Sequence, residues 1–344
     1  VVYTIYGITC LTERRDFMTL RIATSIREPQ YLAYCRAQGI NIAHVELEKN
    51  DELGNIEKLK GFDGVIAMSE PYSSRLLEEL KDNLKIIIRH GIGYDRVDIQ
   101  YAQKLGICCC NTPGAMSTGV AETALTMMLE LCRKFYLYNA NLSRGRWDKG
   151  IKTNQFEGST IGLVGFGNIA QCLARYLNGF TGCRILAYDL HYNEEALKKY
   201  HVEKATLEQI AKESDFVSIH VPLLPSTAKM IDAKFLSTMK PHAYLINTSR
   251  GGTVDETALI QALRDGVIAG AALDVFETEP VSPDNPLLFL DNVFKTPHIA
   301  TNTNGCALAG FDGCIKCLKE YEAGQVPEYA LNPGYVNYLP SKRG

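Results

Sequence analysis

The sequence lacks two features that would direct it to a membrane or to nucleic acid. No apolar run approaches the roughly 20 residues of a membrane-spanning helix. No block of Lys and Arg stands out in a chain whose formal net charge is −3. Because phosphate binding requires clustered cations, we expect neither a membrane nor a nucleic-acid partner. The content of 46% apolar and 22% charged residues is typical of a soluble globular protein.

Regular cysteine spacing is also missing. The 11 cysteines are an odd number and are scattered along the chain, which predicts a reducing, cytoplasmic environment and not a disulfide framework. Cys314 and Cys317 form a CxxC motif, but it falls in a helical pattern and has no further ligands at a suitable spacing. We interpret both as thiols on a helix face, and we expect no metal site.

The first 17 residues do not resemble the rest of the chain. Their charges follow the apolar part and no small-residue cleavage site is evident, so a signal peptide is not indicated. Met18 is followed at once by a strand-like segment that starts at Leu20. We therefore interpret residues 1–17 as an extension in front of the fold.

Short apolar runs alternate with helical patterns, which predicts parallel sheets with helices on both faces. The predicted strands are 20–25, 41–47, 64–68, 85–89 and 107–111 in the first half, and 160–164, 184–188, 216–221, 244–248, 270–275 and 293–296 in the second. A chain of 344 residues suits two domains of about 150 residues each. The run 120–135 predicts a helix that is apolar on most faces and packs against another domain or subunit.

A glycine-rich turn follows the first strand of the second half. The sequence GFGNIA, which begins at Gly165, has the pattern G-x-G-x-x-A and leads into a helix. Gly165 permits a tight turn, and Gly167 lets the backbone approach a pyrophosphate at the helix N-terminus. The next strand ends at Asp189, roughly 20 residues on, where an acid binds the ribose hydroxyls. This context predicts a dinucleotide site.

Asp189 also bears on the choice of dinucleotide. Its carboxylate would repel a 2′-phosphate, and residues 190–193 supply no Arg or Lys to accept one, so we expect NAD and not NADP. A second glycine turn begins at His90, but Arg96 stands at its third glycine position and would block close packing. We interpret this second turn as part of a substrate site, because its glycines let backbone amides face a carboxylate.

Three reactive side chains follow predicted strands of the second half. Arg250, Glu279 and His298 each come shortly after a different strand, and ligands of open α/β sheets bind at the carboxyl ends of strands. Each residue taken alone has an ordinary structural interpretation, as a salt-bridge partner, a surface acid or a core histidine. Together, beside a dinucleotide turn, they predict an active site.

With these motifs in this order, the chain resembles the D-isomer-specific 2-hydroxyacid dehydrogenase family over about residues 18–333. The motifs are HGIGYD from His90, NTPGAMSTGVAE from Asn111, GFGNIA from Gly165 with Asp189, NTSRGGTVDE from Asn247, AALDVFETEP from Ala271 and KTPHIA from Lys295.

The resemblance implies hydride transfer between NAD and a D-2-hydroxy acid or its 2-oxo acid. His298 is then the general acid and base, since imidazole titrates near neutral pH. Glu279 pairs with it, and Arg250 grips the substrate carboxylate. The further contacts implied are Asn168, Ile169, Pro222, Thr227, Thr248 and Asp274 for the cofactor, in addition to Gly165, Gly167 and Asp189, and Ile92 and Gly93 for the substrate.

The resemblance also implies the α/β architecture, with two Rossmann-like or flavodoxin-like domains and the active site in the cleft. We expect a discontinuous substrate domain at 18–115 and 306–344, with an NAD-binding Rossmann domain inserted at 116–305. Helices at 117–136 and 306–322 would act as hinges. Family members are commonly dimers, so we expect a homodimer.

Two other functions stay open. D-3-phosphoglycerate dehydrogenases of serine biosynthesis have very similar motifs around Arg250, Glu279 and His298. An NADH-binding corepressor of the same fold is an interaction module that can keep these three residues. The lack of long disordered flanks argues against the corepressor.

The loop after strand 64–68 bears on the substrate. Phosphoglycerate dehydrogenases commonly place an Arg there, whereas this chain has Glu70 and no basic residue before Arg75. An acid near a phosphate would be repulsive, which favours an unphosphorylated acid of the pyruvate or hydroxypyruvate type. If Glu70 instead faces solvent, Arg75, Arg89 or a partner-subunit residue would supply the charge for a phosphate.

Overall fold

The computed structural model describes residues 2–5, 8–11 and 18–339. They form two compact units, in which unit 1 holds the residues up to Met116 and those from Asn304, and unit 2 is Ser117–Thr303. Within the predicted extension, β1 (Val2–Ile5) and β2 (Ile8–Leu11) pair as an antiparallel ribbon. The remainder of residues 1–17 lies outside the described residues, so its interpretation as an extension stays a prediction.

Unit 1 is built on a five-stranded parallel sheet in the order β4-β3-β5-β6-β7. Its strands are β3 (Ile22–Thr24), β4 (Ile42–His44), β5 (Gly64–Ala67), β6 (Ile86–Arg89) and β7 (Cys108–Cys110). Its helices are α1 (Pro29–Ala37), α2 (Glu52–Leu59), α3 (Ser74–Leu80), α4 (Ile99–Lys104), α12 (Asn304–Glu322) and η3 (Pro333–Tyr338).

Both faces of this sheet are covered by helices. Ile86 and Ile88 pack with residues of α1 and α12, whereas Ile87 packs with residues of α2 and α3 on the other side. Successive residues of a strand point to opposite faces, so a strand that is buried on both sides reads as a continuous apolar run. This explains why the short runs IIIR and GVIA were recognisable as strands.

Unit 2 is built on a seven-stranded parallel sheet in the order β10-β9-β8-β11-β12-β13-β14. Its strands are β8 (Thr160–Val164), β9 (Arg184–Tyr188), β10 (Val202–Lys204), β11 (Phe216–Ile219), β12 (Tyr244–Asn247), β13 (Gly270–Leu273) and β14 (Val293–Lys295). Its helices are α5 (Ser117–Arg133), α6 (Phe135–Ser143), α7 (Asn168–Leu177), α8 (Glu194–Lys199), α9 (Leu207–Glu213), α10 (Ala233–Thr238), α11 (Glu256–Arg264), η1 (Gly251–Thr253) and η2 (Pro286–Leu288).

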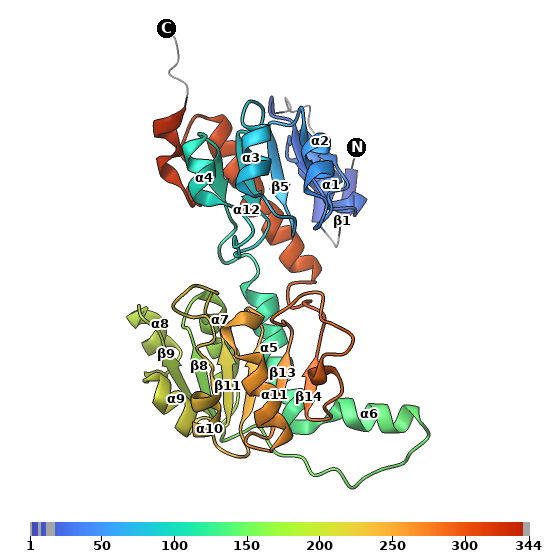
Figure 1. The fold of residues 1–344 in the computed structure, drawn as a ribbon, viewed down its shortest axis with the longest axis vertical. Coiled ribbons are helices and arrows are strands. Elements are labelled where there is room, and N and C mark those ends of the chain that lie inside the picture. Colours follow the sequence, from blue (N-terminus) through green and yellow to red (C-terminus); the bar gives the residue numbers. More distant parts are fainter. Residues whose placement is uncertain (1, 6–7, 12–17, 340–344) are drawn as a thin grey trace. The chain divides into compact units, whose positions relative to one another are not determined.

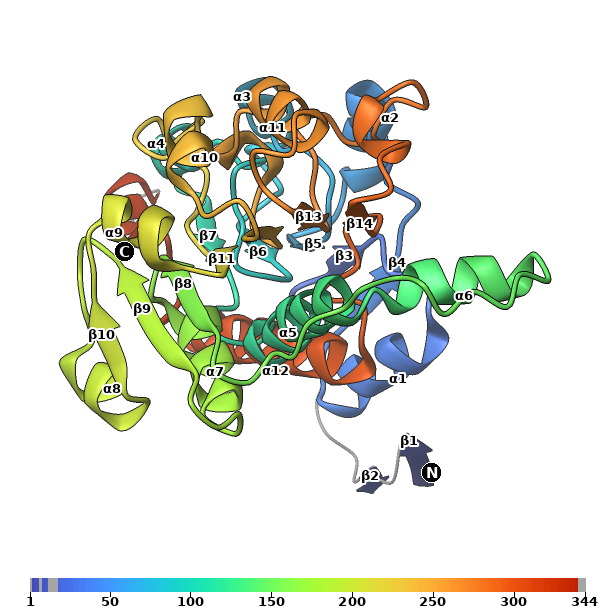
Figure 2. The ribbon, with the colours of Figure 1, turned by 90° about the horizontal axis from the view of Figure 1, so that it is seen from below.

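The order of the first six strands along the chain is 3-2-1-4-5-6, the doubly wound order of dinucleotide-binding sheets, with β14 added at the edge. Helices α5 and α7 cover one face, and α9, α10 and α11 cover the other (Figures 1 and 2). The order in which strands are added to the sheet reverses between β8 and β11, and such sheets bind their ligand at this point.

The predicted helix over 117–136 is confirmed as far as Arg133, where α5 ends, and is wrong in its last three residues. Lys134 has a left-handed backbone with φ of 53°, which ends α5 and starts the separate helix α6. Helix α5 packs against α7, β12 and β13 of its own unit, and this packing accounts for its apolar faces. Helix α6 has no buried residue and projects from unit 2 (Figures 1 and 2).

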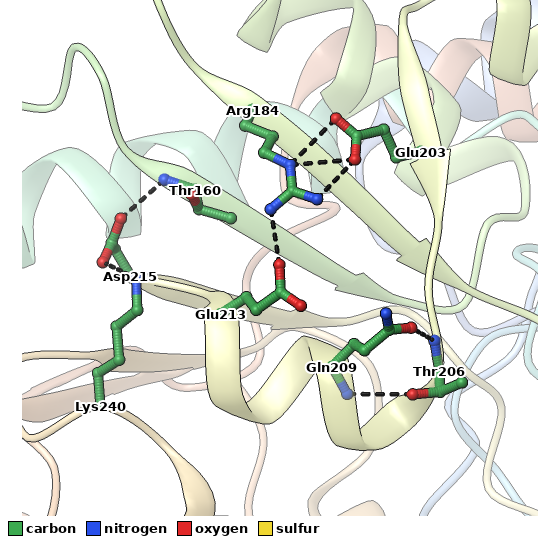
Figure 3. Close-up of polar contacts among 8 residues, drawn as sticks. All are labelled: Thr160, Arg184, Glu203, Thr206, Gln209, Glu213, Asp215 and Lys240. Atoms are coloured by element: carbon green, nitrogen blue, oxygen red, sulfur yellow. Dashed lines mark hydrogen bonds and ion pairs between the residues drawn. The ribbon is translucent and has the colours of Figure 1, made fainter.

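A polar network joins strands at the amino edge of this sheet (Figure 3). Asp215, at the start of β11, accepts hydrogen bonds from the Thr160 N–H of β8 and from Lys240 Nζ, both at 2.8 Å. Burial raises the pKa of Asp215, but these two bonds and one from His242 outweigh it, so the pKa lies below its usual value. The carboxylate thus joins β8 to the segment that precedes β12.

Neighbouring polar groups hold the edge strands (Figure 3). Arg184 on β9 pairs with Glu203 on β10 at 2.6 Å and with Glu213 at the end of α9 at 2.7 Å. Thr206 and Gln209 form a reciprocal capping box at the start of α9.

In the part of the chain that the structure describes, none of the helices has the length and apolar character to cross a membrane.

Candidate active site

The glycine turn after β8 has the geometry that a pyrophosphate requires. Gly165 has φ of +95°, and a Cβ there would lie 2.9 Å from the backbone of His220. A Cβ on Gly167 would have no heavy atom within 4 Å, so this side of the turn is open. Helix α7 begins at Asn168, and the residue in front of it supplies no side-chain cap. Its first N–H groups therefore face the open side with the positive end of the helix dipole.

Asp189 sits beside this turn, directly after β9. Its carboxylate accepts the N–H of Phe166 at 2.6 Å and that of His191 at 2.9 Å. Each oxygen keeps a lone pair for a further donor. Asp189 thereby fixes the glycine turn and offers acceptors where ribose hydroxyls would bind.

Two buried polar atoms at neighbouring strand ends have no hydrogen-bond partner among the described residues. They are Nε2 of His220, after β11, and Oγ1 of Thr248, after β12. Burial lowers the pKa of His220 to about 4, so its ring is neutral at physiological pH. Thr227 donates to the carbonyl of Pro222 at 2.6 Å in the adjoining loop. Because buried polar groups are normally paired, the unpaired atoms fit a site built for a ligand, and a dinucleotide is what this edge of the sheet accommodates.

Arg250 lies on a loop whose path requires a glycine at the next position, Gly251. A Cβ on Gly251 would lie 1.9 Å from the carbonyl carbon of Phe276, so the loops after β12 and β13 touch through their backbones. Asn247, buried at the end of β12, donates to the carbonyl of Arg250 at 3.0 Å and accepts the N–H of Ser249. This packing brings Arg250 close enough to Glu279 for its charge to lower the pKa of Glu279.

Asp274 is fully buried at the end of β13 and organises the loop after β14. Its carboxylate accepts Oγ1 of Thr296 at 2.6 Å and the N–H groups of Ile299 at 2.8 Å and Ala300 at 2.9 Å. The Asp274 carbonyl also accepts the N–H of His298 at 2.8 Å. These bonds stabilise His298 in a left-handed backbone conformation with φ of 55°. Asp274 is thus a positioning residue in this structure, and its predicted role as a cofactor contact stays a prediction.

His298 and Glu279 form the reactive pair. Nδ1 of His298 lies 2.7 Å from Oε2 of Glu279. A carboxylate can only accept, so Nδ1 carries the proton and Nε2 points elsewhere. Burial raises the pKa of Glu279, but the bond and charge of His298, the Phe276 N–H and Arg250 together bring it below its usual value. Glu279 is therefore ionised at neutral pH and orients the imidazole.

The predicted catalytic residues come together, because β12, β13 and β14 are adjacent parallel strands that end on the same edge. The predicted substrate contacts Ile92 and Gly93 are in unit 1, after β6, where Ile92 is 46% exposed and its carbonyl accepts Nδ2 of Asn111. Among the described side chains, no group of three or more His, Cys, Asp and Glu could hold a metal ion.

The sequence analysis did not predict the residues that position the candidate catalytic ones. Asn247, Gly251 and the loop-organising role of Asp274 were not singled out. A signal was available, because Asn and Asp end otherwise apolar strands, and a polar residue at the end of a buried strand must find partners.

Fold and site together define a nucleotide-dependent dehydrogenase, with a dinucleotide turn and an Arg, Glu and His group on one sheet edge. Residues 125–300 match the family model of the D-isomer specific 2-hydroxyacid dehydrogenase NAD binding domain. The chain belongs to this family, as its motifs predicted. It is an NAD-dependent oxidoreductase of D-2-hydroxy acids and their 2-oxo acids.

Named relatives span most of the chain. A glyoxylate reductase of Korarchaeum cryptofilum is 36% identical over 291 residues, which cover 83% of this chain and 87% of the relative. A hydroxypyruvate reductase of Thermotoga maritima is 41% identical over 267 residues, covering 77% and 85%. The solved NAD complex of a D-isomer specific 2-hydroxyacid dehydrogenase from Lactobacillus delbrueckii ssp. bulgaricus superposes with a TM-score of 0.76 at 26% identity, covering 91% and 100%.

Proposed function

We propose that this protein interconverts a small, unphosphorylated 2-oxo acid of the glyoxylate or hydroxypyruvate type and its D-2-hydroxy acid, with His298 as the general acid and base. The observation that carries the proposal is the 2.7 Å bond between Nδ1 of His298 and Glu279, beside Arg250 at the dinucleotide edge of unit 2. The glyoxylate reductase and the hydroxypyruvate reductase among the relatives agree with this substrate class, whereas a D-3-phosphoglycerate dehydrogenase of Methanocaldococcus jannaschii, 37% identical over 279 residues, represents the phosphorylated alternative.

The proposed mechanism assigns one task to each side chain. Bound NAD would supply the hydride donor or acceptor. Nε2 of His298 donates the proton that the alkoxide needs during reduction and removes it during oxidation. Glu279 holds Nδ1–H and balances the imidazolium charge, and Arg250 binds the substrate carboxylate through its planar fork.

The cofactor would bind along the carboxyl ends of β8, β9, β11 and β12. We propose Gly165, Gly167, Asn168 and Ile169 for the pyrophosphate and Asp189 for the ribose hydroxyls. Further contacts would come from Pro222, Thr227, Thr248 and Asp274. The open side of Gly167 and the unpaired Oγ1 of Thr248 support these assignments.

The two units would have different roles, one in cofactor binding and the other in substrate binding. We propose that unit 2 is the NAD-binding domain, inserted into a discontinuous substrate domain formed by unit 1. Ile92 and Gly93, at the carboxyl end of β6, are proposed as substrate contacts through their backbone amides.

We further propose a homodimer in a reducing compartment such as the cytoplasm, with no nucleic acid as a partner. The dimer is supported by the exposed apolar side chains of α6 and the loop after it, of which Phe135 is 55%, Leu142 57% and Trp147 78% exposed. The compartment is supported by the ten cysteines with described side chains, none of which forms a disulfide.

A substrate panel tests the function. NADH oxidation should be followed with glyoxylate, hydroxypyruvate, pyruvate and 3-phosphohydroxypyruvate.

We expect His298→Ala to lower kcat by about 10²–10⁴ with the best substrate of the wild type, the usual loss for a general acid–base group, while NADH binding persists. His201→Asn, at an exposed left-handed turn position, is the matched control and should keep activity. Turnover of His298→Ala within the range of this control would remove His298 from the mechanism.

A further inference from the structure

A buried acid closes the turn that follows β5. Glu70 is 6% exposed, so the possibility that it faces solvent is wrong. Its Oε2 accepts the N–H groups of Met68 at 3.0 Å and Ser69 at 3.1 Å. Its other oxygen accepts the hydroxyl of Ser25, the residue that follows β3. The carboxylate thus ties together the carboxyl ends of two adjacent strands.

The hydrogen bonds of Glu70 have the form of an anion site. Two successive backbone N–H groups, from Met68 and Ser69, converge on a single oxygen, which is the arrangement of an anion-binding nest. In many nests the anion comes from a ligand. Here the chain supplies its own carboxylate, and the hydroxyl of Ser25 completes the set of donors.

The nest adjoins the proposed substrate contacts of unit 1. Strands β5 and β6 are paired with Ala67 opposite Arg89, so the loops after them start side by side. Arg96 Nη1 donates to the carbonyl of Ser69 at 3.1 Å, and the Tyr72 N–H donates to the carbonyl of Arg96 at 2.7 Å. The loop that carries Glu70 is therefore fastened along the loop that carries Ile92 and Gly93, at the ligand-binding edge of the sheet.

Neither the nearby Arg89 nor the nest itself is available to bind a second anion. Nη1 of Arg89 donates to the carbonyls of Ala67 at 3.1 Å and His90 at 2.7 Å, which anchors this guanidinium to the backbone. The N–H groups that could hold a phosphate are already bonded to Glu70. A phosphate ester brought to this edge would meet a carboxylate where it needs donors.

We propose that Glu70 is a specificity-determining residue, which fills the nest after β5 and so excludes substrates that carry a second anionic group. This rests on the proposed function, because it takes the carboxyl edge of unit 1 as part of the substrate site. Neutral groups, such as the hydrogen of glyoxylate or the hydroxymethyl of hydroxypyruvate, meet no repulsion there.

Two substitutions separate the charge of Glu70 from its shape. In Glu70→Gln, the amide oxygen can accept both backbone N–H groups and the NH₂ can donate to the Ser25 hydroxyl, so only the charge is lost. Glu70→Ala also removes the acceptor and frees the nest. Glu79→Gln, on the exposed face of α3, makes the same charge change away from the nest and is the control.

The experiment compares kcat/KM for hydroxypyruvate with that for 3-phosphohydroxypyruvate. We expect the wild type and Glu79→Gln to prefer hydroxypyruvate, and Glu70→Gln to reduce this preference by about tenfold or more, which is about 1.4 kcal/mol. Glu70→Ala should reduce it further, and inorganic phosphate should inhibit this variant competitively at lower concentrations than the wild type. Thermal unfolding and NADH affinity report whether each variant keeps its fold, and the conservative Glu70→Gln decides if Glu70→Ala does not fold.

The outcomes distinguish this inference from the function on which it rests. A wild-type preference for the phosphorylated acid would overturn the proposed substrate class itself. A wild-type preference for hydroxypyruvate that Glu70→Gln leaves within about twofold of Glu79→Gln would overturn the role of Glu70 alone.

Discussion

His298 combines a reactive ring with an uncommon backbone. A left-handed conformation at a residue other than glycine is sparsely populated and persists where the surroundings enforce it. Here the Asp274 carbonyl accepts the N–H of His298, and the Asp274 carboxylate binds the two N–H groups that follow. The histidine is thus placed by its main chain as well as by Glu279, which suits a group that must meet a substrate atom at hydrogen-bond distance.

We predict that Asp189 selects the cofactor. We expect Asp189→Asn to reduce the preference for NADH over NADPH in kcat/KM by about tenfold, since the repulsion of a 2′-phosphate disappears while an acceptor for the ribose remains. Asp189→Ala also removes the acceptor of the Phe166 N–H and should weaken both cofactors. A wild-type enzyme that uses NADPH as well as NADH would contradict this account of the ribose site.

The convergence of the candidate site residues on one sheet edge was predictable, because the predicted chemistry requires particular side chains after strands. Arg250, Glu279, His298 and Asp189 all lie at strand ends of one sheet. The inward turn of Glu70 was not predictable, because a sequence pattern does not show that the acid bonds the backbone N–H groups of the two residues before it. Such short-range contacts depend on local dihedral angles, which polar loop sequences leave open.

At the scale of elements, the Asp215 network lends itself to measurement (Figure 3). Asp215→Asn replaces a carboxylate that holds Thr160 and Lys240, and we expect the free energy of unfolding at pH 7 to fall by about 1–2 kcal/mol. Asp291→Asn, an exposed position of the same unit, should change it little.

The pH dependence of this loss has a definite sign. The pKa of Asp215 is lowered in the folded protein, so its contribution is complete above the unfolded pKa and is lost as the pH falls through the folded value. The difference between wild type and Asp215→Asn should therefore be constant near neutral pH and shrink below about pH 4. Urea unfolding at several pH values checks this, and a difference that grows on acidification would exclude the carboxylate as its source.

Elements with a strong apolar signal were predicted well, and those without one were not. The bounds of β8 and β9 agree with the sequence prediction. The edge strand β10 has one buried residue in three, and the short helix α8 before it is rich in charged residues. Neither segment shows a clear periodicity of apolar residues, so neither was predicted. Several strands end one or two residues before their predicted ends, among them β11, β12 and β13, after which the loops with the candidate site residues begin.

At the scale of the whole molecule, the arm formed by α6 and the loop after it tests the proposed dimer. Trp147→Asp and Leu142→Asp should raise the dissociation constant of the dimer by about tenfold or more, because exposed aromatic and apolar side chains carry most of the energy of an interface. Leu53→Asp, at a position 60% exposed in unit 1, is the control. Sedimentation equilibrium measures the effect, and an unchanged dissociation constant in both arm variants would place the interface elsewhere.

The two-domain α/β architecture followed from the alternation of strands and helices, but the projection of the arm did not. Only Lys134 separates α5 from α6, and no glycine or proline marks this break. The apolar residues at the start of α6 resemble those that α5 buries, so the predicted helix ran on to residue 136, and the rest of α6 was not predicted.

The return of the chain to unit 1 through α12 has a consequence for synthesis on the ribosome. Phe311, Cys314 and Leu318 of α12 belong to the same core as Ile22 and Ile86, so unit 1 lacks part of its interior until α12, which follows unit 2 in the chain, has been translated. Unit 2 is continuous from Ser117 to Thr303 and has all its strands once it leaves the exit tunnel. Since domains generally fold as units, we expect unit 2 to fold while the strands of unit 1 still expose the apolar surface that α12 later covers.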